Sequence, residues 1–212
     1  MKRIFLTSSA HKVARNIARD IGNARGMKLA LINTPIEFNI READFLDKYK
    51  VAFKKEGFVI SDYTISSKSS GQIKEDLLGY DVIFVSGGNP FYMLQKIQET
   101  HSAKVLRDLI EKEGKIYIGS SAGAIVAGPN IYCSYRPDLE REYEGFKLSN
   151  YTGLGLVDFI VFPHWGDDEV KKTYFDFRLS HYFTEKNKII LLTNYQYIKV
   201  EGNTYKIIDV KN

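Results

Sequence analysis

The sequence predicts an α/β protein in which helices cover both faces of a mostly parallel sheet. Short apolar runs alternate along the chain with segments whose apolar residues recur every three or four positions, which is typical of strands alternating with helices. The run at 82–85 is apolar at every position, as expected of a strand buried on both faces. Glycine-rich corners follow this run and a later one, and loops at that edge of an open α/β sheet bind ligands.

The first half of the chain predicts a strand, a helix, a second strand, a second helix and a third strand. The second strand is expected to stop at Asn33-Thr34-Pro35, because these residues favour a turn. The apolar face of the first helix is marked by residues at helical spacing, namely Val13, Ala14, Ile17, Ala18 and Ile21. The five elements are expected at residues 4–6, 13–21, 29–32, 41–55 and 58–60.

The second half repeats this alternation after the strand at 82–85. A long helix is expected from Met93 to Ile110, with a break near His101 and Ser102, and a strand at 115–118 runs into a glycine-rich corner. Residues 134–150 are rich in Tyr, Arg and Glu without periodicity, which indicates a surface excursion. The later elements are expected as a strand at 158–162, a helix at 168–186, a strand at 189–192 and a hairpin at 197–210.

Length and composition narrow the class of protein. The 212 residues fit one domain, 1–212, and a hydrophobic content of 44% argues against a disordered chain. A net charge of +4 without a long basic run gives little support for a nucleic-acid partner, and no apolar run is long enough to cross a membrane. The single cysteine, Cys133, cannot form an internal disulfide and is expected to be a buried, inert thiol. We expect a cytoplasmic protein, monomeric or homodimeric, with no metal or other cofactor.

The segment Gly119-Ser120-Ser121-Ala122-Gly123 matches the G-x-S-x-G pattern at a strand-to-helix corner. A serine at such a corner is held in a tight turn, with its hydroxyl directed away from the chain and surrounded by the amides that begin the helix. Ser121 is therefore the candidate nucleophile. The structural alternative is that the glycines only permit a tight turn, while Ser120 or Ser121 caps the helix.

A second glycine-rich segment, Ser86-Gly87-Gly88-Asn89, follows the preceding apolar strand. Consecutive glycines allow backbone amides to turn toward a developing oxyanion, so the amides of Gly88 and Ala122 are the candidate oxyanion hole. The segment lacks the Lys-Ser/Thr pair of a phosphate-binding loop and the third glycine of a dinucleotide-binding loop, which disfavours a nucleotide. Taken alone, this segment fits a purely structural turn equally well.

A third signal is His164, which also follows a predicted strand. A serine hydroxyl such as that of Ser121 needs a base, and histidine titrates near neutral pH. The other three histidines, His11, His101 and His181, fall in helical patterns and are interpreted as solvated or packing residues. The structural alternative for His164 is stacking on its aromatic neighbour, but its coincidence with two other strand-end signals favours the catalytic interpretation.

Together these segments resemble the peptidase E and cyanophycinase family of serine peptidases over most of the chain. The likeness is carried by four segments: Gly-Gly-Asn at 87–89, YIGSSAGA at 117–124, GLV at 155–157 and FPH at 162–164. The resemblance implies a flavodoxin-like three-layer fold, akin to class I glutamine amidotransferases, and hydrolysis of short peptides. It also implies that Ser121 attacks the scissile carbonyl to form an acyl-enzyme, with His164 as its base.

One departure from the family pattern concerns the third member of the triad. Family members carry an acidic residue after the penultimate strand, where this chain has Asn194. An amide fixes a histidine tautomer but cannot stabilise the imidazolium with a full charge, so slower turnover is expected. Asp158, Asp167 and Asp168 are nearby carboxylates and offer an alternative third member.

Substrate preference is implied by the resemblance alone. Aspartyl dipeptidases of the family follow their histidine with an arginine-rich stretch, which would hold the carboxylate of an N-terminal Asp. The expected substrate contacts here are Asn89, Lys171 and Arg136, with Lys172 and Arg178 as further cations. Lysine matches a carboxylate less well than arginine, and a lysine pair on a helix is more commonly a solvated face.

Two rival functions stay open. Asn194 also fits a family member that has lost efficient catalysis and acts as a binding or regulatory protein. An esterase of the α/β-hydrolase class shares the serine corner, but that fold usually places the acid between the serine and the histidine in a longer chain. Fluorophosphonate labelling of Ser121 distinguishes an enzyme from the binding or regulatory protein. Activity on esters but not on peptides would favour the esterase.

Overall fold

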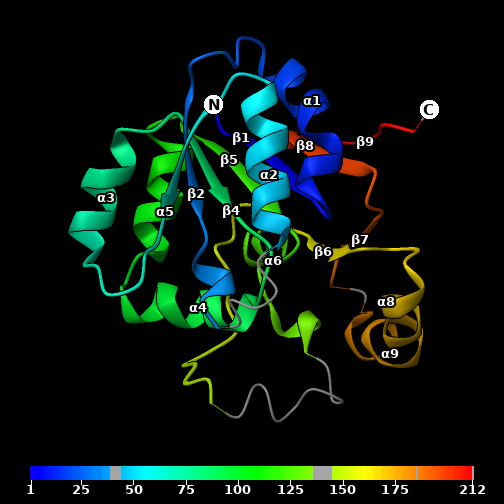
Figure 1. Ribbon diagram of the computed structural model, residues 1–212. Helices are drawn as coiled ribbons and strands as arrows, with labels where there is room; N and C mark the ends of the chain where they lie inside the picture. The colour runs from blue at the N-terminus through cyan, green and yellow to red at the C-terminus, as the bar shows by residue number, and fades with distance from the viewer. Residues whose placement is uncertain (39–43, 136–144, 185, 212) are drawn as a thin grey trace.

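A seven-stranded sheet, in the order β3-β2-β4-β5-β1-β8-β9, forms the centre of the molecule (Figure 1). The computed structural model describes residues 1–38, 44–135, 145–184 and 186–211. Five strands run parallel, and β8 and β9 form an antiparallel hairpin beside β1, so the predicted mostly parallel sheet and C-terminal hairpin are confirmed. The strands are β1 (Arg3–Thr7), β2 (Lys28–Ile32), β3 (Val59–Tyr63), β4 (Val82–Val85), β5 (Ile116–Ser120), β8 (Gln196–Glu201) and β9 (Thr204–Asp209).

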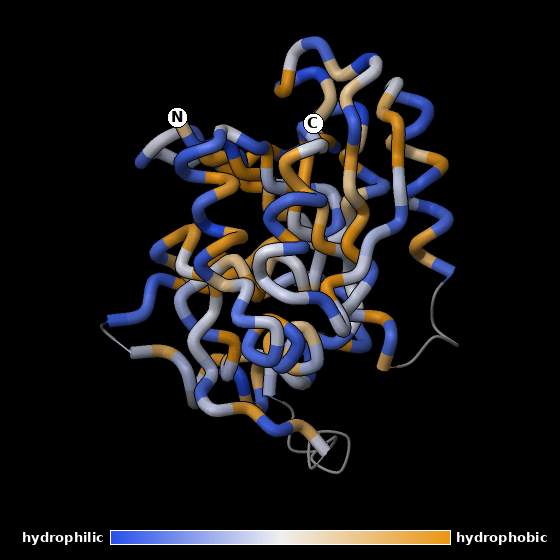
Figure 2. Tube along the Cα trace, turned by 90° about the vertical axis from the view of Figure 1, so that its left-hand side faces the viewer, coloured by the Kyte–Doolittle hydropathy of each residue, from blue (hydrophilic) through white to orange (hydrophobic). Residues whose placement is uncertain are grey.

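Helices cover the two faces of this sheet, because successive strand residues point to opposite sides. Phe5 and Phe84 pack with α1 and α2 in one buried cluster, whereas Ile4 and Val85 pack with α3, α4, α5 and α6 in the other. Hydrophobic residues are accordingly concentrated on the strands and on the helix sides that face them (Figure 2). The helices are α1 (Ala10–Ile21), α2 (Asp44–Lys55), α3 (Ser70–Leu78), α4 (Pro90–Glu99), α5 (Ala103–Glu111) and α6 (Ala122–Val126).

The strands β6 (Ile160–Pro163) and β7 (Ile189–Leu192) form a separate parallel pair. This pair packs into the cluster that contains α6, and one buried side chain ties its carboxyl ends to the end of β1. The Ser8 hydroxyl donates a hydrogen bond to the Leu192 carbonyl at 2.7 Å and accepts one from the His164 amide at 3.0 Å. The loops after β1, β6 and β7 therefore meet beside α6.

The expected elements agree with the observed ones only in part. The break near His101 is confirmed, since α4 ends at Glu99 and α5 begins at Ala103. The helix expected at 168–186 ends at Tyr182 and consists of α8 (Asp168–Thr173), a π-helical turn (Tyr174–Arg178) and α9 (Leu179–Tyr182). The helix α3 was not expected from the sequence, although its Ser69 and Gln72 form a capping box that signals a helix start.

The surface excursion expected at 134–150 is described only in part, because 136–144 lie outside the described residues. It is preceded by a short 3-10 turn, Tyr132–Ser134. Within the described residues, no helix carries an apolar stretch long enough for a membrane span.

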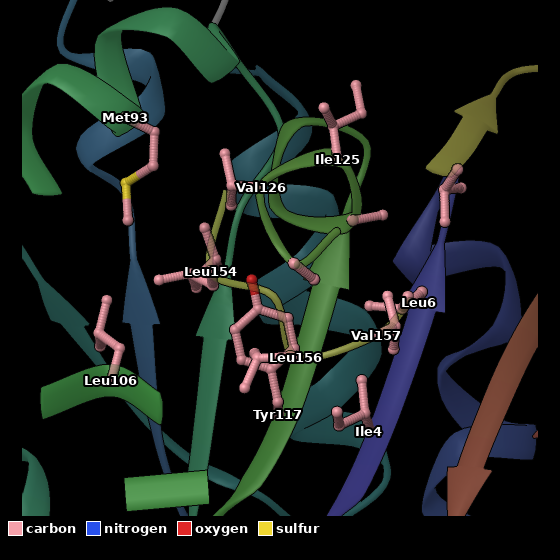
Figure 3. Close-up of a cluster of buried hydrophobic side chains, with 14 of the residues drawn as sticks. Ile4, Leu6, Met93, Leu106, Tyr117, Ile125, Val126, Leu154, Leu156 and Val157 are labelled. Atoms are coloured by element: carbon pink, nitrogen blue, oxygen red, sulfur yellow. The ribbon is translucent and has the colours of Figure 1, made fainter. Parts of the chain in front are cut away.

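Tyr117 of β5 links the core to the first turn of α6. Its ring is fully buried, and its hydroxyl points toward α6 (Figure 3) and donates a hydrogen bond of 2.7 Å to the Gly123 carbonyl. A buried carbonyl that loses its donor retains the whole free-energy penalty of its desolvation. The hydroxyl therefore stabilises the turn that follows Ser121.

We predict that Tyr117→Phe lowers the free energy of unfolding by about 1–3 kcal/mol, because the Gly123 carbonyl is left buried without its donor. Urea unfolding followed by circular dichroism measures this change. Tyr205→Phe is the matched control, since Tyr205 is 45% exposed and its hydroxyl makes no hydrogen bond with a described residue. Equal stabilities for the two variants would contradict the structural role of the Tyr117 hydroxyl.

Candidate active site

Ser121 lies at the corner between β5 and α6 in a strained backbone conformation, with φ 49° and ψ −104°. Such a conformation costs a non-glycine residue about 1–3 kcal/mol and is retained where the surroundings enforce it. The Ser121 amide donates to the Thr7 carbonyl at 2.9 Å, which fixes the corner to the end of β1. The Ser121 side chain makes no capping hydrogen bond to α6, so the structural alternative of a helix cap is wrong for this residue.

The two glycines of the motif allow backbone segments to approach closely. A Cβ on Gly119 would lie 2.6 Å from the Gly123 carbonyl oxygen, and a Cβ on Gly123 would lie 2.1 Å from the Val85 carbonyl oxygen. Real side chains essentially never make such contacts with backbone. The corner is therefore built from glycine because β4, β5 and α6 meet there without room for side chains.

The neighbouring serine, Ser120, has a structural role. Its buried hydroxyl donates to the Ser8 carbonyl at 3.1 Å and accepts from the Ala10 amide at 3.2 Å. Because that single proton is already donated, the Tyr49 hydroxyl is the donor in its 2.9 Å contact with Ser120 Oγ. Ser120 thus holds β5, α1 and α2 together and leaves Ser121 as the serine available for chemistry.

His164 lies at the end of β6, with its imidazole next to the serine corner. Its Nε2 is 3.0 Å from Ser121 Oγ, and its Nδ1 is 2.8 Å from Oδ1 of Asn194. These distances are within hydrogen-bond range. The structure therefore brings together the three residues predicted as Ser121, His164 and Asn194, which come from the loops after β5, β6 and β7.

The side-chain amide of Asn194 has one orientation that satisfies all its neighbours. Asn194 is buried; its Oδ1 also accepts from Ser9 Oγ at 2.8 Å, and its Nδ2 donates to the two carboxylate oxygens of Asp167 at 2.8 and 2.7 Å. Since Oδ1 can only accept, His164 must carry its proton on Nδ1. The lone pair of Nε2 then faces the Ser121 hydroxyl, as a general base requires.

Burial lowers the pKa of His164 below its ordinary value, because the imidazolium loses hydration. The hydrogen bond with Asn194 and the negative charge of Asp167 act in the opposite direction, and the positive charges of Lys12 and Arg178 lower the pKa further. The net effect keeps the imidazole neutral at pH values where an ordinary histidine is partly charged. A neutral imidazole can accept the proton of Ser121.

The predicted oxyanion-hole amides lie on the two backbone segments that flank Ser121. A Cβ on Gly87 would lie 3.6 Å from Cβ of Ser121, so this glycine loop packs against the serine. Gly88 has φ +126°, and a Cβ there would lie 2.5 Å from the Pro35 carbonyl oxygen. Among the described residues, neither the Gly88 amide nor the Ala122 amide has a hydrogen-bond acceptor. Both donors are therefore available for a ligand.

The sequence model of peptidase family S51 matches residues 4–208, which is nearly the whole chain. The chain belongs to peptidase family S51 and is a peptidase. The resemblance to the peptidase E family is thereby confirmed.

Individual relatives of this S51 peptidase agree with that assignment. It is 31% identical to an uncharacterized peptidase of Listeria monocytogenes over 203 residues, which are 95% of this chain and 96% of that protein. It is 36% identical over 87 residues to a Drosophila melanogaster protein named "Probable alpha-aspartyl dipeptidase", covering 41% and 34% of the two chains. A crystal structure of a candidate peptidase E from Listeria monocytogenes EGD-e superposes with a TM-score of 0.86 over 99% of both chains at 29% identity.

The three predicted substrate contacts of this S51 peptidase have different surroundings. Asn89 Oδ1 accepts from the amides of Phe91 and Tyr92, so it caps α4. Lys171 is exposed on α8 and has no side-chain hydrogen bond or ion pair with a described residue. Arg136 lies outside the described residues. Their roles toward a substrate stay predictions.

Some residues around the triad were not found from the sequence. Ser8 and Ser9, directly after β1, hydrogen-bond to the backbone of His164 and the side chain of Asn194. The signal for them was a pair of serines at the carboxyl end of a strand, the same signal that identified the other site residues. Burial raises the pKa of Cys133 to about 11, which agrees with an inert thiol.

No three His, Cys, Asp or Glu side chains of the described ranges lie in a group that could hold a metal ion.

We predict that His164 titrates below the ordinary histidine pKa, because burial disfavours its charged form. Carbon-proton NMR of the imidazole, assigned by the signal lost in His164→Gln, measures this pKa. Asn194→Ala is expected to lower it further, since the hydrogen bond with Asn194 raises it. A titration at or above the ordinary value in the unmodified protein would show that the imidazole is solvated in solution.

Proposed function

We propose that this S51 peptidase is a serine peptidase that hydrolyses short peptides through an acyl-enzyme on Ser121. The observation that supports this proposal most strongly is the 3.0 Å approach of His164 Nε2 to Ser121 Oγ, in the tautomer that accepts a proton. A serine hydroxyl becomes a useful nucleophile when a base accepts its proton during attack. The strained corner adds to this by holding the hydroxyl in a fixed position.

Acylation follows from these positions. Ser121 Oγ attacks the carbonyl carbon of the scissile bond as its proton moves to His164 Nε2. The resulting oxyanion lies between the Gly88 and Ala122 amides, which stabilise the negative charge that develops there. The C–N bond then breaks, and the proton on Nε2 passes to the leaving amine. The products of this half-reaction are the free amine and an ester at Ser121.

Deacylation reverses the roles. Water gives a proton to His164 Nε2 as its oxygen attacks the ester carbonyl, and the same two amides hold the second oxyanion. The C–O bond to Ser121 breaks, and Oγ recovers its proton from Nε2. The carboxylic acid product leaves, and the site returns to its starting protonation state.

A preference for N-terminal Asp is the finer part of the proposal, and Arg178 is its strongest candidate cation. The guanidinium lies 5.1 Å above the Tyr174 ring, and one of its terminal nitrogens donates to the Ser134 carbonyl at 2.9 Å. Its Nε is buried without a hydrogen-bond partner among the described residues, and no described carboxylate lies within ion-pair distance. Its positive charge is one of those that lower the pKa of His164, although burial of the imidazole lowers it most. The name of the Drosophila relative agrees with such a preference.

We predict that a fluorophosphonate labels Ser121 stoichiometrically, because Ser121 Oγ displaces fluoride from phosphorus as His164 accepts its proton. Ser121→Ala should abolish labelling, and His164→Ala should slow it by about 10²- to 10⁴-fold. Mass spectrometry of the labelled peptide distinguishes Ser121 from Ser120. An unreactive Ser121 in the folded protein would instead favour the binding or regulatory function.

We predict that Asp-Leu is cleaved roughly 10- to 100-fold more efficiently than Ala-Leu, as expected for one charged hydrogen-bonded contact. The comparison of kcat/KM includes Asn-Leu, which matches Asp-Leu in shape but lacks the charge. Arg178→Gln should remove the preference, with Lys171→Gln as the matched variant. Equal kcat/KM values for Asp-Leu and Ala-Leu in the unmodified protein would contradict an aspartyl preference. If Lys171→Gln abolishes the preference and Arg178→Gln does not, the contact belongs to Lys171.

A further inference from the structure

We propose that Asp167 is a positioning residue for this reaction, holding the Asn194 amide and supplying the negative charge that Asn194 lacks. This inference rests on the proposed function, because it concerns how His164 is oriented and stabilised during serine catalysis. It makes the working unit a chain of four side chains, Ser121, His164, Asn194 and Asp167, rather than a triad. Ser121 and His164 are joined by a hydrogen bond of 3.0 Å, and His164 and Asn194 by one of 2.8 Å. Two hydrogen bonds, of 2.8 and 2.7 Å, join the Asn194 amide to the Asp167 carboxylate.

The Asp167 side chain does not cap the helix that follows it. It occupies the N-cap position of α8, where an aspartate side chain usually accepts a hydrogen bond from a helix amide. Its side chain makes no such bond, and both of its oxygens accept from Nδ2 of Asn194 instead. The backbone supports this arrangement: Gly166 has φ +91°, and the Asp167 amide donates to the His164 carbonyl at 3.1 Å, which turns the chain back toward the imidazole.

The Asp167 carboxylate also determines which way the Asn194 amide is oriented. If the Asn194 amide were rotated by 180°, its oxygen would face the Asp167 carboxylate, and its NH₂ group would face Nδ1 of His164. The imidazole would then carry its proton on Nε2 and could not accept the proton of Ser121. The carboxylate therefore selects the amide orientation and, through it, the reactive tautomer. In the serine-protease triad, replacing the Asp by a neutral Asn leaves the histidine in the wrong tautomer and lowers kcat.

Asp167 also acts on His164 through its negative charge. The described charged groups that act on His164 are Asp167, Lys12 of α1 and Arg178 of the π-helical turn, so Asp167 is the one anion beside two cations. Oδ2 of Asp167 lies 3.9 Å from Nδ1, close enough to stabilise the imidazolium that forms during attack. The Asp167 side chain is 47% exposed, and solvent screening moderates this attraction.

The experiment compares Asp167→Asn with Asp168→Asn. Both remove one carboxylate charge from adjacent exposed positions, but no described contact joins Asp168 to Asn194. We expect Asp167→Asn to lower kcat about 10-fold with little change in KM, and Asp168→Asn to retain the original kcat. Asp167→Ala should lower kcat further, since it removes the acceptors that orient the amide as well as the charge. Thermal unfolding verifies that all three variants fold.

The pH profile separates catalytic positioning from a merely structural role. Asp167 raises the pKa of His164, so Asp167→Asn should move the acid limb of kcat/KM to lower pH while the plateau falls. A loss caused by local unfolding would lower the plateau without this displacement.

The exchange variant Asp167→Asn with Asn194→Asp gives an independent result. It places the carboxylate directly against Nδ1 and an amide behind it, so we expect kcat to recover above that of Asp167→Asn. Asn194→Asp alone sets two carboxylates against each other and should not raise kcat. If the unmodified protein is labelled at Ser121 and Asp167→Asn has the kinetics of Asp168→Asn, the role of Asp167 is overturned while the serine mechanism stands. If Ser121 is never labelled, the proposed function itself fails.

Discussion

The site depends on the attachment of the β6–β7 pair to the end of β1. These two strands are not hydrogen-bonded to the main sheet, so the sheet itself does not fix where His164 and Asn194 lie. The buried hydroxyl of Ser8 provides the link, with the Leu192 carbonyl on one side and the His164 amide on the other. The Ser121 amide donates to the carbonyl of the neighbouring Thr7. The nucleophile and its base are therefore both held by hydrogen bonds to the same two adjacent residues.

This attachment gives the reactive groups a rigid environment and limited freedom. Ser121 and His164 both have positive φ, with values of 49° and 61°. Both conformations are held by hydrogen bonds at the end of β1, from the Ser121 amide to Thr7, its last residue, and from the His164 amide to Ser8, the residue after it. Strain of this kind persists when surrounding packing enforces it, and it keeps reacting atoms in place. Burial of the imidazole then keeps it neutral, while the Asn194 amide sets its tautomer. The chemistry arises from this combination of fixed geometry and selected protonation.

The sequence predicted the parts of this arrangement that depend on local pattern. The G-x-S-x-G corner, the glycine pair before Asn89 and the histidine after a strand were all found because each follows an apolar run. The separate pairing of β6 with β7 could not be predicted, since their apolar patterns fit the main sheet equally well. The hydrogen bonds between Asn194 and Asp167 were also beyond prediction, because they depend on a turn at Gly166 that reverses the chain. Asp167 was expected only as one of three carboxylates.

The serine mechanism is tested by a structure of the protein after reaction with a fluorophosphonate, because the adduct traps the tetrahedral geometry at the reacting atom. We expect phosphorus bonded to Oγ of Ser121, one phosphoryl oxygen within hydrogen-bond distance of the Gly88 and Ala122 amides, and His164 still hydrogen-bonded to Asn194. An adduct on another side chain, or a phosphoryl oxygen that faces solvent away from both amides, would contradict it.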